Sequence, residues 1–247
     1  MRHIRTMFWD NVDARMVAAQ AAAVAALGGA LRQDRATGTP HAAWLDRTLA
    51  DLGPDDTVLL LDIDCLPLDR AVIERAFAVA EAGGVFGVAQ VANHLDASLI
   101  YAAPSFLAVA RRTWDALGRP PFAADAQYDV GARLTAAARA AGVAVELLYP
   151  TFTLVPRWHL GGRGCYGIGT FYEGSVFHLF QSRHAAAYAE AFDTVARCVA
   201  DGRPIDYLAL HARANSTAMQ LLNAMAEARR RAGKFRRSAA RKLGRLF

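Results

Sequence analysis

Residues 58–68 most constrain the fold of this chain of 247 residues, because they join an unbroken apolar run to two acids. The run Val58–Leu61 is typical of a buried strand, and Pro67 is expected to stop it. Asp62 and Asp64 are two residues apart, so in a strand their side chains point to one face. Two carboxylates are costly inside an apolar sheet, whereas at the carboxyl end of a parallel strand they can share a cation or a polar substrate. The stretch predicts a strand that ends at a ligand site, with a strand ending in two solvated acids as the alternative.

Strand and helix signals alternate along most of the chain. Strands are predicted over residues 3–9, 30–35, 58–64, 85–90, 99–103, 143–149 and 177–180, and helices over residues 12–27, 41–52, 70–82, 105–117 and 129–141. This alternation favours an α/β fold with a mainly parallel twisted sheet and helices on both faces. Further helices are expected after it. We therefore divide the chain into an α/β domain over residues 1–195 and a C-terminal helical extension over residues 196–247.

A glycine-rich stretch over residues 161–174 contains six glycines and predicts a mobile loop. Glycine lets backbone N–H groups approach phosphate oxygens, and an arginine there, Arg163, can pair with phosphate. The stretch has the composition of a lid over a diphosphate, with a plain surface loop as the alternative.

Charge is distributed unevenly along the chain. Residues 228–247 hold nine of the 28 Lys and Arg and none of the 23 Asp and Glu, so the rest of the chain is acidic by about four charges. A basic nucleic-acid-binding domain is therefore not expected. The sequence contains no apolar run of 18 residues that would span a membrane. Three cysteines, Cys65, Cys165 and Cys198, have no metal-like spacing and fit free thiols in a reducing cytoplasm.

The basic C-terminal tail has the pattern of an interfacial helix. On a helical wheel, the apolar side chains from Phe235 onward gather on one face and most of the cations on the other. We expect a cytoplasmic protein that this tail can hold at the anionic inner face of the plasma membrane. A solvated chain end is the alternative.

Three kinds of protein commonly place a carboxylate pair after an apolar strand. A P-loop NTPase needs a Gly-x-x-x-x-Gly-Lys-Ser/Thr motif, and residues 1–233 contain no lysine. A haloacid-dehalogenase-type phosphatase carries its Asp-x-Asp on the first strand and needs a later lysine, so this function is less favoured. The third kind is the nucleotide-sugar glycosyltransferase, in which the acids bind Mg²⁺ or Mn²⁺ beside the departing diphosphate.

At this point the chain resembles the GT-A glycosyltransferase superfamily over roughly residues 1–185. The segment Leu61–Leu68 is similar to the donor-metal motif of that family, and Tyr101–Gly118 is similar to its acceptor-side strand and helix. The resemblance implies a Rossmann-like catalytic domain and a Mn²⁺- or Mg²⁺-dependent transfer of a sugar from a nucleotide-sugar donor to an unknown acceptor. A GT-A-like module that binds a sugar nucleotide or a partner without turnover remains the alternative.

The resemblance also implies roles for individual residues. Asp64 and the downstream His178 are the expected metal ligands, and Asp62 is expected to orient the metal or the ribose. For His178 the alternative is a buried histidine bonded to the backbone.

Asp129 matches the acid that deprotonates the acceptor hydroxyl in inverting members, although it could equally be a plain helix N-cap. Asp125 competes with it for this role. Trp9 and Asn11 follow the first strand, where the family binds the nucleotide base. Arg163 is the candidate for the diphosphate.

Overall fold

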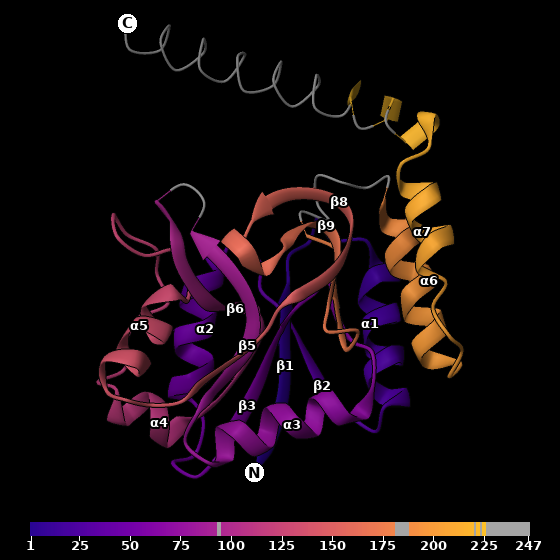
Figure 1. The fold of residues 1–247 in the computed structure, drawn as a ribbon. Coiled ribbons are helices and arrows are strands. Elements are labelled where there is room, and N and C mark those ends of the chain that lie inside the picture. The colour runs from indigo at the N-terminus through magenta and orange to yellow at the C-terminus, as the bar shows by residue number, and fades with distance from the viewer. Residues whose placement is uncertain (93–94, 181–187, 220, 223, 226–247) are drawn as a thin grey trace, which may run out of the picture.

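The structure is a computed structural model that describes residues 1–92, 95–180, 188–219, 221–222 and 224–225. Its centre is a six-stranded sheet in the order β2-β1-β3-β6-β5-β7, covered by helices on both faces (Figure 1). The strands β2, β1 and β3 run parallel to one another, as do β5 and β7, whereas β6 is antiparallel to both of its neighbours. The fold is therefore α/β with a mixed, mostly parallel sheet. The bounds are β1 Arg2–Phe8, β2 Leu31–Arg35, β3 Thr57–Asp62, β5 Val85–Ala92, β6 Asp96–Ala110 and β7 Val145–Leu148.

The helices cover the sheet because β3 is apolar on both faces. Leu59 and Leu61 pack into a core with α3, while Val58 and Leu60 pack into a second core with α2, α4 and α5. Alternation of side chains along the strand explains this division. The helices on the sheet are α1 Ala14–Ala26, α2 His41–Ala50, α3 Arg70–Glu81, α4 Arg111–Ala116 and α5 Ala132–Ala140. Among the described residues, no helix is long and apolar enough to span a bilayer.

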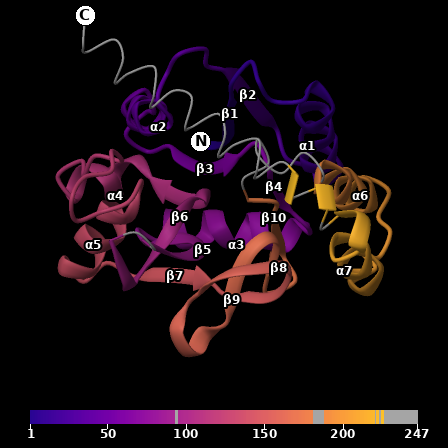
Figure 2. The same cartoon turned by 90° about the horizontal axis from the view of Figure 1, so that it is seen from above.

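A second, smaller sheet is antiparallel and has the order β4-β10-β9-β8. Figure 2 shows it beside the large sheet, on the side of α6 and α7. A third core joins the small sheet to α1 and α6, with Phe177 and Phe192 among its fully buried side chains. The bounds are β4 Cys65–Pro67, β8 Pro150–His159, β9 Cys165–Tyr172, β10 Val176–His178, α6 Ala189–Ala200 and α7 Tyr207–Ala214.

The first half of the helix predicted over residues 105–117 is a strand, and only the second half is helical. The strand β6 continues to Ala110, and the helix α4 begins only at Arg111. An apolar run such as Phe106–Ala110 fits a buried strand as well as a buried helix, and here the antiparallel pairing with β3 and β5 decides. The pairing of β5 with β6 shifts its register beside Gly87, opposite the segment around Pro104. Any side chain at Gly87 would collide with the carbonyl oxygen of Phe106, so this close approach requires glycine.

The mobile loop predicted over residues 161–174 is also wrong. Only a short 3₁₀ turn, Gly161–Arg163, precedes β9, which pairs along its length with β8. A side chain at Gly167 would meet the carbonyl oxygen of Val155 on β8, so this glycine permits close strand contact.

Two further predicted boundaries can be compared with the structure: the start of the helix predicted from residue 129, and the division of the chain after residue 195. Helix α5 begins at Ala132 after Gly131, which is the N-cap at a φ of 81°, so Asp129 is not the N-cap. The proposed division between residues 195 and 196 falls inside α6. The basic tail from residue 228 onward lies outside the described residues.

Candidate metal centre and cavity

One of the two acids lies at the end of β3, and the other lies just beyond it. Asp62 is the last residue of the strand, and Asp64 lies in the tight turn that leads into β4. The prediction of one strand through residue 64 is wrong in this detail, because the strand ends two residues earlier. The buried Gln20 of α1 holds the turn, since its amide nitrogen donates to the carbonyl oxygens of Asp62 at 2.7 Å and Cys65 at 3.0 Å. The side chain of Gln20 therefore fixes the backbone that carries both carboxylates.

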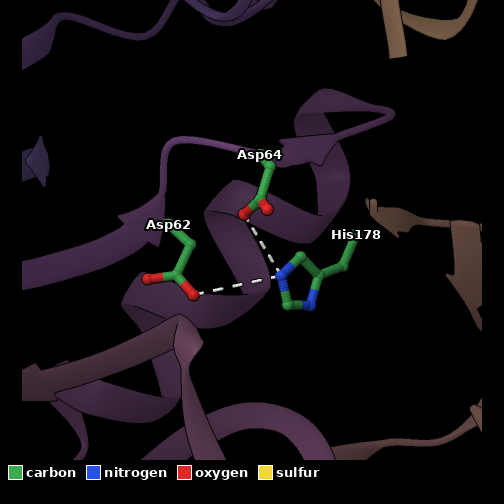
Figure 3. A group of neighbouring side chains, drawn as sticks. All are labelled: Asp62, Asp64 and His178. Atoms are coloured by element: carbon green, nitrogen blue, oxygen red, sulfur yellow. Dashed lines mark ion pairs between the residues drawn. The ribbon is translucent and has the colours of Figure 1, made fainter. Parts of the chain in front are cut away.

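His178 reaches the acids through the small sheet. It pairs with Cys65 across β10 and β4, and the next backbone N–H, of Leu179, donates to the carbonyl oxygen of Asp64 at 2.9 Å. Nε2 of His178 lies 3.3 Å from Oδ1 of Asp64 and 3.9 Å from Oδ2 of Asp62 (Figure 3). Figure 3 shows both carboxylates turned toward this one ring nitrogen. The structure thus brings together the three residues expected at the metal.

The burial of the group differs from one member to the next. The side chain of His178 is 4% exposed and that of Asp64 is 10% exposed, whereas that of Asp62 is 31% exposed. Nδ1 of His178 is buried and has no hydrogen-bond partner among the described residues. A buried histidine normally has such a bond, whether it lies in a core or binds a metal. The contacts of His178 with the two carboxylates are made through the opposite nitrogen, Nε2.

The spacing and chemistry of the three side chains fit a single divalent cation. One ligand atom from each residue lies within 4.8 Å of the others. Oxygen ligands about 2.1 Å from one ion are about 3 Å apart when adjacent and about 4 Å apart when opposite. Two carboxylates and an imidazole are a donor set that divalent metals accept. This buried group could therefore bind a metal ion.

The group borders a cavity of about 310 Å³ at the carboxyl ends of β1 and β3. From β1 the chain passes to β2 on one side and then to β3 on the other, so the cavity lies at the switch point of the sheet. Open α/β sheets hold ligands at this crevice, and the volume is sufficient for a small ligand. The lining residues that carry the argument are Trp9, His41, Asp62, Asp64, Asp129 and His178.

His41 is a site residue that the sequence analysis did not single out. It is the first residue of α2, and its Nε2 lies 3.3 Å from Oδ1 of Asp62. Its ring lies against the indole of Trp44, with ring centroids 6.3 Å apart. The one available signal was its position just after Pro40, between a parallel strand and a helix, where binding loops of α/β sheets occur.

Asp129 lines the cavity, and its competitor does not. Oδ2 of Asp129 accepts a hydrogen bond from the hydroxyl of Tyr101 at 3.3 Å. Burial, with the neighbouring Asp129 charge, raises the pKa of Tyr101, so this phenol stays protonated and remains a donor. Asp125 instead forms an ion pair with Arg133 and caps its own turn, and it is absent from the cavity lining.

The three residues expected at the nucleotide are not all brought to the cavity. Trp9 lines it and is fixed by a 2.9 Å hydrogen bond from its indole N–H to the carbonyl oxygen of Thr39. Asn11 is exposed in the turn before α1 and is not a lining residue. Arg163 is not a lining residue either, and its guanidinium lies 4.8 Å from the ring centre of Tyr149.

Neither a protein-family model nor a curated protein sequence matches this chain. The assignment of a function therefore depends on the site itself.

Proposed function

We propose that this protein is a metal-dependent glycosyltransferase that moves a sugar from a nucleotide-sugar donor to an acceptor. The observation that supports this function most strongly is the convergence of Asp62, Asp64 and His178 at a switch-point cavity. A carboxylate pair beside an imidazole suits a hard cation that also takes phosphate oxygens as ligands. The cavity beyond the pair has the aromatic and polar lining that a nucleotide sugar requires.

In this proposal Asp64 and His178 hold the Mn²⁺ or Mg²⁺, and Asp62 orients the metal or the donor ribose. When bound, the cation supplies positive charge that stabilises the departing nucleoside diphosphate. Gln20 keeps the two carboxylates in place through the backbone of their turn. The indole of Trp9 offers a fixed flat surface at the cavity edge for the nucleoside, whereas Asn11 and Arg163 lie outside the lining and need movement to take part.

Asp129 is the proposed proton acceptor for the acceptor hydroxyl if the transfer inverts the sugar. It lines the same cavity as the metal ligands. The hydroxyl of Tyr101 donates to Oδ2, and each carboxylate oxygen can accept more than one hydrogen bond, so the carboxylate can still take the proton that the attacking hydroxyl releases. The other oxygen, Oδ1, accepts the backbone N–H of Val130, which fixes the direction of the carboxylate.

The test uses Asp64→Ala with Asp55→Ala as a matched control. Both changes remove one carboxylate, but Asp55 is exposed in the turn before β3, at the opposite end of the strand. We would measure thermal unfolding with UDP-, GDP-, dTDP- and CMP-sugars, with and without Mn²⁺. A ligand at 100 times its Kd stabilises by about 2.7 kcal/mol. Asp64→Ala should lose the metal-dependent stabilisation by one of these donors, and Asp55→Ala should keep it.

Release of the nucleoside diphosphate is the second readout. Parent protein should release it slowly from the stabilising donor in the presence of Mn²⁺, and Asp64→Ala should not. Binding without release would instead assign a non-catalytic sugar-nucleotide-binding module. Equal binding of Mn²⁺ and donor by Asp64→Ala and the parent would refute the metal site.

A further inference from the structure

A thiol and an imidazole lie side by side at the turn between β8 and β9. Sγ of Cys165 is 3.0 Å from Nδ1 of His159, and neither residue lines the cavity of the candidate metal centre. His159 is the last residue of β8 and Cys165 is the first of β9, and the two are directly opposite each other in the ladder. Residues paired in this way have their side chains on one face of the sheet. The register of the hairpin therefore brings the two groups together.

The hairpin holds this pair firmly. The hydroxyl of Thr153 donates to the backbone carbonyl oxygen of Cys165 at 2.8 Å. The next residue, Tyr166, is fully buried, and its hydroxyl donates to the carbonyl oxygen of Val91 on β5 at 3.2 Å. Its ring packs against that of Trp158, with centroids 5.3 Å apart. Because side chains alternate along a strand, these two aromatic rings point inward and leave the thiol and the imidazole on the opposite face.

A small molecule can reach the pair from outside. His159 is exposed and Cys165 is partly exposed. Residues 161–164 of the turn between them are exposed as well, and no described atom lies within 4 Å of a Cβ placed at Gly161 or Gly162. Figure 2 shows the hairpin of β8 and β9 extending beyond the other elements at the lower edge of the view. The part of the chain that the structure describes therefore leaves this side of the pair open.

The two groups have the chemistry of an activated nucleophile. The nucleophilic form of cysteine is the thiolate, and an ordinary thiol is only a few per cent ionised at pH 7. A histidine within hydrogen-bond distance can take the thiol proton and so raise the rate of attack.

The other sulfur of a disulfide with Cys165 has to come from another molecule. The chain has three cysteines, and all three thiols are free. Cys65 of β4 and Cys198 of α6 are both buried, each in a different element from Cys165. An external disulfide is thus the reaction partner that the pair can meet at the surface.

We propose that Cys165, with His159 as its base, is a site of covalent modification by small-molecule disulfides. The thiol proton moves to Nδ1 of His159, and the thiolate attacks one sulfur of the reagent. The S–S bond of the reagent breaks, and its leaving thiolate takes the proton from His159. The products are a mixed disulfide on Cys165 and one free small thiol. This reaction does not depend on the proposed glycosyltransferase function, so the two proposals can fail separately.

The experiment treats the full-length protein with glutathione disulfide at pH 7 and locates the modification by mass spectrometry of peptides. The variant is His159→Gln, and the matched control is His211→Gln, which removes an exposed histidine of α7. We expect one glutathione per chain, on Cys165, with the two buried cysteines unmodified. The reaction should slow at least about tenfold in His159→Gln and less than about twofold in the control. Thermal unfolding of each variant checks that the fold is unchanged.

Repeating the reaction at about pH 9.5 separates a base from a residue that only shapes the hairpin. An ordinary thiol is mostly ionised at that pH, so His159→Gln should then react within about twofold of the parent. Three results would overturn the proposal. They are a His159→Gln variant that reacts at the parent rate at pH 7, one that is slowed equally at both pH values, and attachment of glutathione to Cys65 or Cys198 in preference to Cys165.

Discussion

Nε2 of His41 and Oδ1 of Asp62 are 3.3 Å apart, so the Asp62 carboxylate lies between two histidines. On its other side, Oδ2 faces Nε2 of His178 at 3.9 Å. The two rings come from distant segments, α2 and β10. A carboxylate contacted on both sides has little freedom to turn, which is how residues outside the ligand set tune a metal site.

If Asp62 orients the metal, His41→Ala should weaken Mn²⁺ binding by about tenfold to a hundredfold, the usual effect of removing a side chain that holds the groups around a metal in place. The melting temperature should change little, because the His41 ring lies at the cavity edge and is 23% exposed. Calorimetric titration with Mn²⁺ measures the affinity. His159→Ala removes an exposed histidine of β8 and is the control. If both variants bind Mn²⁺ like the parent, Asp62 does not depend on His41.

His178→Ala separates a metal ligand from a core histidine. As a ligand, its loss should weaken Mn²⁺ binding at least about tenfold. The ring of Phe180 packs against that of His178, with centroids 4.5 Å apart, so Phe180→Ala disturbs the packing and keeps the donor nitrogen. We expect Phe180→Ala to retain most of the Mn²⁺ affinity. A His178→Ala variant that melts earlier but binds Mn²⁺ normally would remove His178 from the site.

Gly167→Ala should destabilise the protein by about 1–3 kcal/mol, the usual cost of overpacking. Its Cβ would meet the Val155 carbonyl oxygen on the paired strand. Gly162→Ala is the matched control, since nothing lies within 4 Å of a Cβ at that position, and it should change the stability by less than about 0.5 kcal/mol. Urea denaturation compares the two. Equal stability would mean that this stretch is a loop after all.

We expect the Asp46→Asn variant to become more stable relative to the parent protein as the pH rises. Burial raises the pKa of Asp46 above its ordinary value of 3.8, although its carboxylate accepts the backbone N–H of Phe122 at 3.0 Å. Because the folded state holds this proton more tightly, the contribution of Asp46 to stability falls as the pH rises above 3.8. Asparagine keeps the acceptor oxygen and carries no charge.

The measurement for Asp46→Asn is the free energy of unfolding in urea from about pH 3.5 to about pH 7. The difference between variant and parent should move in favour of asparagine across this window. A difference that does not vary with pH would contradict the assigned effect of burial.

The sequence predicted the local elements better than their pairing. The apolar run before Asp62 identified the central strand, since few other structures accept four consecutive aliphatic residues before two acids. The path of β6 could not be read from its apolar residues, because its antiparallel pairing with β3 and β5 is a long-range property. Gly167 was misread for a similar reason. Flexibility and close strand contact both favour glycine, and only the neighbouring strand tells them apart.

The candidate site shows the same limit. Asp62 and Asp64 could be found from their spacing alone, whereas the role expected for His178 came from a family resemblance. Its contact with the acids depends on the pairing of β10 with β4, more than 100 residues apart along the chain. His41 was missed because its partner, Asp62, is 21 positions away and belongs to another element.

The three side chains of the candidate metal centre come from the large sheet, the small sheet and the turn between them. Asp62 ends a strand of the large sheet, and His178 ends a strand of the small sheet. An ion bound by both residues would link the two sheets, and its binding energy would oppose their separation. Hydrogen exchange at the amides of β4 and β10 should then slow when Mn²⁺ is added, while exchange at β2, on the far edge of the large sheet, stays as it was.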